Sequence, residues 1–126
     1  MNNICTICAR GGSKGVPNKN IKLLNGIPLI TYTIQQAIQS KLFSKVVVST
    51  DSQKIANVAL AAGAECWFLR PKYLSLDKAS KLDAIRHAVS KAESTFKTSY
   101  DFVFDLDATS PLRKVSDIKK AFQCFV

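Results

Sequence analysis

Short apolar runs alternate with longer amphipathic segments along the whole chain. Four runs rich in aliphatic, β-branched or aromatic residues predict strands: Ile4–Ala9, Lys45–Thr50, the weaker Ala64–Leu69 and Tyr100–Asp107. The first run is almost wholly apolar, which is typical of a parallel strand buried on both faces. Apolar positions at helical spacing between and after these runs predict four helices.

Each predicted helix carries one apolar stripe. The first begins at Pro28, which suits a first helical position, and the second spans Ser52–Ala62. The apolar residues expected in the third helix are Leu82, Ile85, Val89 and Ala92, and those in the last are Ile118, Ala121, Phe122 and Phe125. Alternating strands and helices indicate βαβ units. We therefore expect an α/β fold with a mainly parallel sheet and helices on both faces.

Size and composition narrow the class of protein. The chain has 126 residues, of which 47% are hydrophobic and 21% charged, as in one globular domain rather than a disordered segment. No apolar run approaches the length of a bilayer span, and no basic region precedes the first apolar run, so we expect a cytoplasmic protein. The chain stops within a helical pattern, "KKAFQCFV". We interpret residues 1–126 as the N-terminal part of a longer protein.

Four cysteines include the pair Cys5 and Cys8, a C-x-x-C spacing that also occurs in zinc and redox sites. In a strand, residues three apart point to opposite faces, so one ion cannot bind both sulfurs. Small buried side chains in a reducing compartment are the better interpretation. His87, the only histidine, lies away from every motif and is interpreted as structural or exposed.

The most informative segment is the basic, glycine-rich stretch "ARGGSKGVPNKN" at residues 9–20. The net charge is +9, and the first acidic residue of the chain is Asp51, which we expect to cap the following helix. A field of one sign attracts an anion. The segment also leaves the carboxyl end of the first predicted strand, where ligands bind in open α/β folds. A solvated surface is the interpretation for five other lysines: Lys41, Lys45, Lys114, Lys119 and Lys120.

This loop has the chemistry of a phosphate site. Gly11 and Gly12 allow backbone N–H groups to approach phosphate oxygens, Arg10 offers a planar fork, and Lys14 and Lys19 are mobile charges. It is neither a P-loop, because no Gly-Lys pair is present, nor a dinucleotide fingerprint, because the glycine spacing differs.

Five stretches together resemble the acylneuraminate cytidylyltransferases, the CMP-sialic acid synthetases. They are "ICARGGSKGVPNKNI", "NGIPLITYTI", "VVVSTDSQKIANVA", "FLRPKYLS" and "ATSPLR", and "DLDATSPLR" is most similar to the branch for sugars such as legionaminic acid. The resemblance implies a Rossmann-like nucleotidyltransferase fold. It also implies an enzyme that couples CTP to an acidic nonulosonic sugar with Mg²⁺, and a homodimer when full length. The later part of such enzymes supplies more metal ligands and most of the sugar pocket.

The resemblance implies roles for single residues. Arg10, Lys14 and Lys19 would hold the triphosphate as catalytic residues, with Lys14 nearest the reacting phosphate, and Asn20 would help hold the nucleotide. Arg70 and Ser80 lie in regions that contact the nucleotide in relatives. The alternatives are a surface charge for Arg70 and a helix N-cap for Ser80. From the turn "TSPLR", Arg113 could reach a phosphate or the sugar carboxylate.

Asp105 and Asp107 are the candidate metal ligands. They lie two apart on a predicted strand, so both side chains point the same way. Two like charges buried together require a cation, and Mg²⁺ bound by one or two carboxylates plus phosphate oxygens would supply it. The alternative is an exposed strand end with both carboxylates solvated. Many relatives carry Gln at the position that matches Asp107.

Three other functions remain open. One is a nucleotidyltransferase for another sugar, such as deoxy-octulosonate, and another is an inactive fragment that keeps the fold. The third is a basic module for RNA or DNA. Against it, the aromatic residues are not interleaved with the basic loop. We therefore expect CTP and an acidic sugar as partners, and neither nucleic acid nor a membrane.

Overall fold

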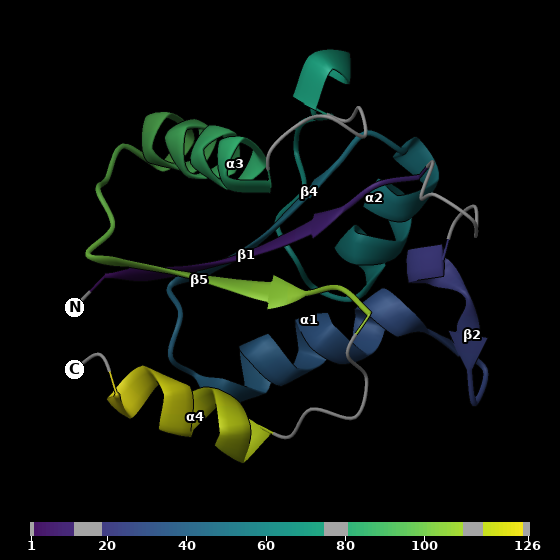
Figure 1. The fold of residues 1–126 in the computed structure, drawn as a ribbon, viewed down its shortest axis with the longest axis horizontal. Helices are drawn as coiled ribbons and strands as arrows, with labels where there is room; N and C mark the ends of the chain where they lie inside the picture. The colour runs from purple at the N-terminus through teal and green to yellow at the C-terminus, as the bar shows by residue number, and fades with distance from the viewer. Residues whose placement is uncertain (1, 12–18, 75–80, 110–114, 125–126) are drawn as a thin grey trace.

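A three-stranded parallel sheet organises the chain (Figure 1). The computed structural model describes residues 2–11, 19–74, 81–109 and 115–124. Strands β1 (Asn3–Ala9), β4 (Lys45–Thr50) and β5 (Phe102–Asp107) lie in the order β4-β1-β5. β1 pairs in parallel with both neighbours. The predicted α/β fold with its parallel sheet is confirmed.

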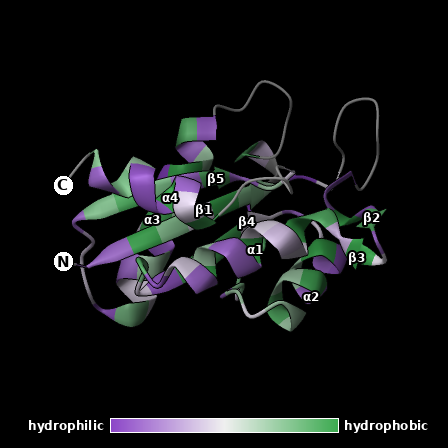
Figure 2. Ribbon diagram, turned by 90° about the horizontal axis from the view of Figure 1, so that it is seen from below, coloured by the Kyte–Doolittle hydropathy of each residue, from purple (hydrophilic) through white to green (hydrophobic). Residues whose placement is uncertain are grey.

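Helices cover both faces of this sheet, as predicted. The helices are α1 (Leu29–Ser40), α2 (Gln53–Ala61), α3 (Lys81–Phe96) and α4 (Val115–Gln123). One core cluster joins β1 and β4 to α1 and α2 and includes Ile7, Ile34 and Ile55, all fully buried. A second cluster on the other face joins Ile4 and Val47 to Ala92 of α3. Figure 2 shows hydrophobic residues along the strands and mixed polar and apolar residues around the helices.

The prediction of a strand at Ala64–Leu69, the third of the four, was wrong. This segment makes one isolated parallel bridge, between Val47 and Glu65. Beyond the bridge the chain runs to Arg70, whose backbone N–H bonds the carbonyl of Thr50 at 2.7 Å. Its aromatic residues pack on α3 instead, where Trp67 meets Phe96 edge-on at 5.1 Å.

Two details of the helices also differ from the predictions. Pro28 is the residue before α1 rather than its first residue. α3 buries Ala84, Ala88 and Ala92, whereas Leu82 is 52% exposed. Small side chains let this helix approach the sheet closely, so the larger residues lie at the sides of the contact.

A short hairpin before α1 was not predicted. β2 (Leu23–Leu24) and β3 (Ile27–Pro28) pair antiparallel around Asn25 and Gly26, which have φ values of 54° and 78°. Two consecutive positive φ angles are typical of the tight turns that Asn-Gly favours. Among the described residues, no helix is both long and apolar enough to cross a lipid bilayer.

Candidate functional site

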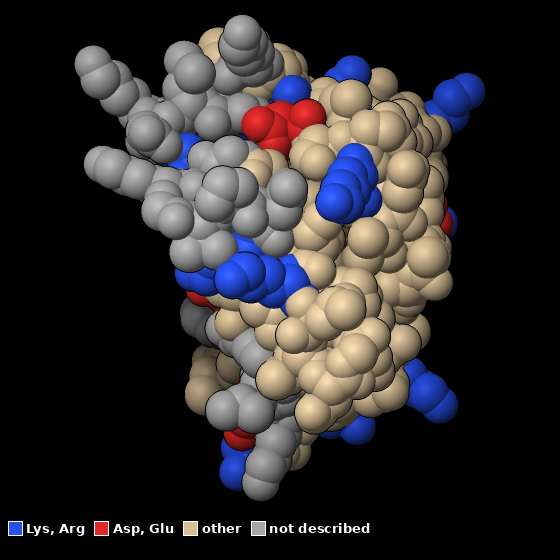
Figure 3. Space-filling model, turned by 90° about the vertical axis from the view of Figure 1, so that its right-hand side faces the viewer, with Lys and Arg blue, Asp and Glu red and all other residues tan. Residues whose placement is uncertain are grey.

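The carboxyl ends of the three parallel strands meet at one edge of the sheet. Arg10 and Gly11 follow β1, Asp51 follows β4, and Asp107 ends β5. Parallel register places these positions side by side, since Cys8 is the partner of both Ser49 and Asp107. Figure 3 shows this end of the molecule, with several Lys and Arg side chains and an acidic side chain among them.

The two described ends of the basic loop are held together. η1 (Lys19–Ile21) is a single 3₁₀ turn, and the buried Asn20 side chain donates a hydrogen bond of 3.1 Å to the carbonyl of Arg10. Lys19 is exposed and Arg10 is half-buried. Asn20 therefore fixes where the loop leaves and rejoins the body, and phosphate binding by Arg10 and Lys19 stays a prediction.

Gly11 packs directly on the start of α2. A Cβ at Gly11 would lie 2.9 Å from Cβ of Ser52, so the close approach requires glycine. The Gly11 N–H also donates to a carboxylate oxygen of Asp51 at 2.9 Å. Asp51 thus holds the loop. The prediction that it caps α2 was wrong, because the cap is Ser52, whose hydroxyl accepts from the Ile55 N–H at 3.3 Å.

Arg70 lies beside the end of β4 and is only 6% exposed. Its guanidinium donates to the hydroxyl of Ser49 (3.0 Å), to the carbonyl of Ser49 (2.7 Å) and to the carbonyl of Leu74 (3.4 Å). Burial lowers the pKa of Arg70, and the nearby carboxylates of Asp51 and Asp105 oppose that shift. The alternative of an exposed surface charge is therefore wrong, while nucleotide contact by Arg70 stays a prediction.

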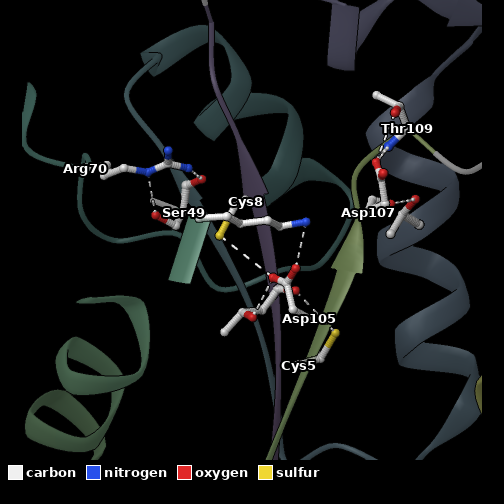
Figure 4. A network of polar contacts seen from close by, with 10 residues as sticks. Cys5, Cys8, Ser49, Arg70, Asp105, Asp107 and Thr109 are labelled. Atoms are coloured by element: carbon white, nitrogen blue, oxygen red, sulfur yellow. Dashed lines mark hydrogen bonds and ion pairs between the residues drawn. The ribbon is translucent and has the colours of Figure 1, made fainter. Parts of the chain in front are cut away.

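Asp105 lies on the α3 face of β5, and both of its oxygens are engaged (Figure 4). The buried hydroxyl of Thr6, its register partner on β1, donates to Oδ1 at 2.9 Å. The ammonium group of Lys81, the first residue of α3, lies 2.9 Å from Oδ2. The side chain of Asp105 is 17% exposed and that of Lys81 58%. The cation that this buried carboxylate needed is therefore supplied by a lysine.

Lys81 was missed by the sequence analysis. The hydrogen bond to Asp105 raises the pKa of Lys81, and burial partly opposes this rise. Burial, followed by the charge of Asp105, also raises the pKa of the neighbouring Cys8 thiol to about 11. Cys8 is therefore a protonated, unreactive thiol at neutral pH. Cys5 lies in the core on the opposite face, which confirms that the C-x-x-C pair does not converge.

Asp107 is exposed at the end of β5. Its Oδ1 accepts hydrogen bonds from the backbone N–H and the hydroxyl of Thr109, at 2.9 Å and 3.0 Å. From α1, the fully buried Thr33 donates to the carbonyls of Asp107 and Ala108 at 3.2 Å and 3.3 Å. These contacts fix the backbone and the side chain at the point where a ligand would meet the strand.

Four predicted site residues lie outside the described residues: Gly12, Lys14, Ser80 and Arg113. Within the described part of the chain, no three His, Cys, Asp or Glu side chains gather closely enough to hold a metal ion. One carboxylate with ligand phosphate oxygens still suits Mg²⁺, which often binds in that way. The Gly11 N–H is already bonded to Asp51, so the described edge offers cationic side chains and an exposed carboxylate, a chemistry that suits a polyphosphate.

Comparison with known proteins identifies the family. A model of the family described as "Cytidylyltransferase" matches residues 4–125. The chain belongs to the cytidylyltransferase family. It is 51% identical over 122 residues to the post-translational flagellin modification protein B of Campylobacter coli, covering 97% of this chain and 52% of that protein. It is 52% identical over 108 residues to the CMP-N,N'-diacetyllegionaminic acid synthase of Campylobacter jejuni, covering 86% and 46%.

A solved cytidylyltransferase structure shares the fold. The CMP:2-keto-3-deoxy-manno-octonic acid synthetase complexed with CTP superposes with a TM-score of 0.78 at 22% identity, covering 99% of this chain and 47% of that one. The expected resemblance to acylneuraminate cytidylyltransferases and the nucleotidyltransferase fold are confirmed. This cytidylyltransferase chain spans about half the length of the curated relatives it matches.

Proposed function

We propose that the protein containing this chain couples CTP to an acidic nonulosonic sugar and releases pyrophosphate. The observation that carries the proposal is the basic loop of residues 9–20, whose ends are tied at the carboxyl edge of β1 through Asn20 and Arg10. The similarity to a CMP-N,N'-diacetyllegionaminic acid synthase supports a sugar of the legionaminic acid type.

In this reaction the anomeric hydroxyl of the sugar attacks the α-phosphorus of CTP. A new P–O bond forms to the sugar, the bond to the β-phosphate breaks, and the hydroxyl proton is lost. Two anions must be brought together, and charge develops on the leaving pyrophosphate. Positioning and electrostatic stabilisation therefore provide most of the catalysis.

The residues of the basic loop would neutralise the triphosphate. Arg10 and Lys19 lie on either side of the Asn20 contact, and we assign them, with Lys14, to the phosphates. Gly11 is held against Ser52 and Asp51, so its backbone stays close to the strand end. Asn20, Arg70 and Ser80, together with Gly12 and Arg113, complete the proposed nucleotide site.

Mg²⁺ is part of this proposal. Asp107 fits the role of metal ligand, because its carboxylate is exposed at the edge where phosphate oxygens would lie. Asp105 fits less well, because Thr6 and Lys81 already engage both of its oxygens. When bound, Mg²⁺ would neutralise charge on the phosphates and the leaving group.

A turnover assay tests the function. The complete protein is incubated with Mg²⁺, CTP and a panel of acid sugars, including legionaminic, sialic and deoxy-octulosonic acids, and pyrophosphate release is measured. We expect release with CTP and a nonulosonic acid, and little with ATP or GTP. Release with deoxy-octulosonic acid alone would support the second candidate sugar, and no release with any sugar would contradict the proposal.

The resemblance also supports a homodimer and a cytoplasmic location for the complete protein. Light scattering after gel filtration measures the first, and a monomer over the working concentration range would contradict it. Cell fractionation measures the second.

A further inference from the structure

Lys81 occupies a position that a helix alone does not favour. It is the first residue of α3, a helix of 16 residues, so its ammonium group lies at the positive end of the helix dipole. Acidic residues stabilise this end of a helix, and basic residues stabilise the other. The helix therefore gives no local reason for a lysine here, and the reason has to come from its surroundings.

Those surroundings hold the ammonium group in one place. Oδ2 of Asp105 lies 2.9 Å from Nζ of Lys81, and the hydroxyl of Thr6 fixes the other oxygen of the same carboxylate. Thr6 is fully buried on the central strand, so this chain of contacts is anchored in the rigid part of the sheet. Thr6 on the central strand thus orients the Asp105 carboxylate, and the carboxylate in turn orients the ammonium group of Lys81.

The ammonium group is also accessible from the carboxyl edge of the sheet. The Lys81 side chain is 58% exposed, although its partner is 17% exposed. An ammonium has three N–H donors, and the contact with Asp105 uses one of them. Asp105, which holds the ammonium group, lies two residues before the last residue of β5, so the group lies near that end of the strand.

We propose that Lys81 is a further anion-binding residue of the nucleotide site and that Asp105, fixed by Thr6, is the positioning residue that aims it. The ligand is an anionic oxygen, either of a CTP phosphate or of the carboxylate of the acid sugar. This inference rests on the proposed function. It gives Asp105 a role through Lys81 in place of direct metal binding.

The test compares Lys81→Met with Lys81→Arg in the complete protein. Lys91→Met is the matched control, because Lys91 is an exposed lysine ten positions further along α3. The dissociation constant of CTP with Mg²⁺ is measured by calorimetry, and KM for CTP and for the sugar is measured by pyrophosphate release. Loss of one charge-assisted hydrogen bond corresponds to about a tenfold weaker interaction. We expect that loss in Lys81→Met, a smaller loss in Lys81→Arg and none in Lys91→Met.

The two sources of the anion give different results. If Lys81 contacts a phosphate, Lys81→Met raises the dissociation constant of CTP and leaves KM for the sugar unchanged. If Lys81 contacts the sugar carboxylate, Lys81→Met raises KM for the sugar and leaves CTP binding unchanged. If Lys81→Met changes only thermal stability and matches Lys91→Met in both binding measurements, the pair is a structural ion pair and the proposal is overturned.

A double-mutant cycle tests the role of Asp105. If Asp105 acts by aiming Lys81, Asp105→Asn weakens binding in the wild type and adds nothing in the Lys81→Met background. The Mg²⁺ concentration for half-maximal activity is then the same for Asp105→Asn and Lys81→Met. An added loss in the double variant, or a higher Mg²⁺ requirement specific to Asp105→Asn, would show that Asp105 acts on its own.

Failure of this inference differs from failure of the proposed function. A wild-type protein that turns over CTP with an acid sugar, combined with an unaffected Lys81→Met variant, overturns the inference alone. A wild-type protein that binds CTP but uses no acid sugar overturns the proposed reaction, and the calorimetric comparison still decides whether Lys81 contacts a CTP phosphate. A wild-type protein that does not bind CTP overturns both.

Discussion

Arg70 and Ser49 are joined by two hydrogen bonds, from Nε to the Ser49 hydroxyl at 3.0 Å and from Nη2 to the Ser49 carbonyl at 2.7 Å. A third bond reaches the carbonyl of Leu74, in the short helix η2 (Lys72–Leu74). One buried side chain thus ties the segment after residue 70 to the carboxyl end of β4. Whatever its contact with a nucleotide, Arg70 supports the edge of the sheet at which the proposed site lies.

Replacing Arg70 with lysine should therefore lower stability although the charge is kept. Lysine cannot reproduce the planar fork, so acceptors at Ser49 and Leu74 lose their donors in a buried place. We expect the free energy of unfolding to fall by about 2 kcal/mol, measured by urea denaturation followed by circular dichroism. The exposed Arg86→Lys on α3 is the control. Equal stability of the two variants would refute the supporting role of Arg70.

Asp51 should matter for nucleotide binding more than for stability. Its carboxylate accepts the Gly11 N–H at 2.9 Å at the start of the basic loop. In Asp51→Ala we expect CTP to bind several-fold more weakly, with about 1 kcal/mol lost from the free energy of unfolding. Calorimetry measures the affinity, with the exposed Asp83→Ala as control. Unchanged CTP affinity would show that the loop is positioned without this contact.

The single histidine gives a direct test by pH. His87 is half-buried and lies edge-on to Phe68 at 5.4 Å, and burial, followed by the charges of Lys91 and Arg70, lowers its pKa below 6.5. The unfolded chain then binds the proton more readily. The contribution of His87 to stability is present above about pH 6.5 and is lost as the pH falls below that value.

Proton NMR measures this pKa, and the imidazole signal that is missing from His87→Gln identifies His87. We expect a midpoint below 6.5 in the folded protein and a weaker acid sensitivity of the melting temperature in His87→Gln. A midpoint at or above 6.5 would be inconsistent with the packing on Phe68.

Two substitutions on α3 should affect stability in the opposite order to the one that its hydrophobic pattern suggests. Ala88 is fully buried and Leu82 is 52% exposed. Ala88→Leu should overpack the contact with the sheet and cost about 1–3 kcal/mol, whereas Leu82→Ala should change stability by at most about 0.5 kcal/mol. Chemical denaturation ranks the two variants, and a larger loss in Leu82→Ala would contradict the observed orientation of the helix.

The same helix shows why the sequence predicts some features better than others. Near-continuous apolar residues, as in Ile4–Ala9, predict a buried parallel strand, and all three strands of the sheet were predicted. A helix that approaches a sheet closely buries alanines, which carry little hydrophobic signal, so the predicted face of α3 was right at Val89 and Ala92 and wrong at Leu82. The hairpin at Asn25 and Gly26 did carry a signal, an Asn-Gly pair between apolar residues.

The candidate site was predictable where its chemistry is local. The basic loop and its position after β1 follow from a continuous stretch of sequence. The pairing of Lys81 with Asp105 does not, because the two residues are brought together by the packing of α3 on the sheet. The available signal was a lysine next to a predicted helix start, where the helix dipole disfavours it.

The structure of the complete protein in complex with CTP and Mg²⁺ tests the central claim most directly. We expect the triphosphate at the carboxyl edge of β1, within hydrogen-bond distance of Arg10 and Lys19, with Asp107 facing the metal. A nucleotide bound elsewhere, with this edge unchanged, would contradict the account.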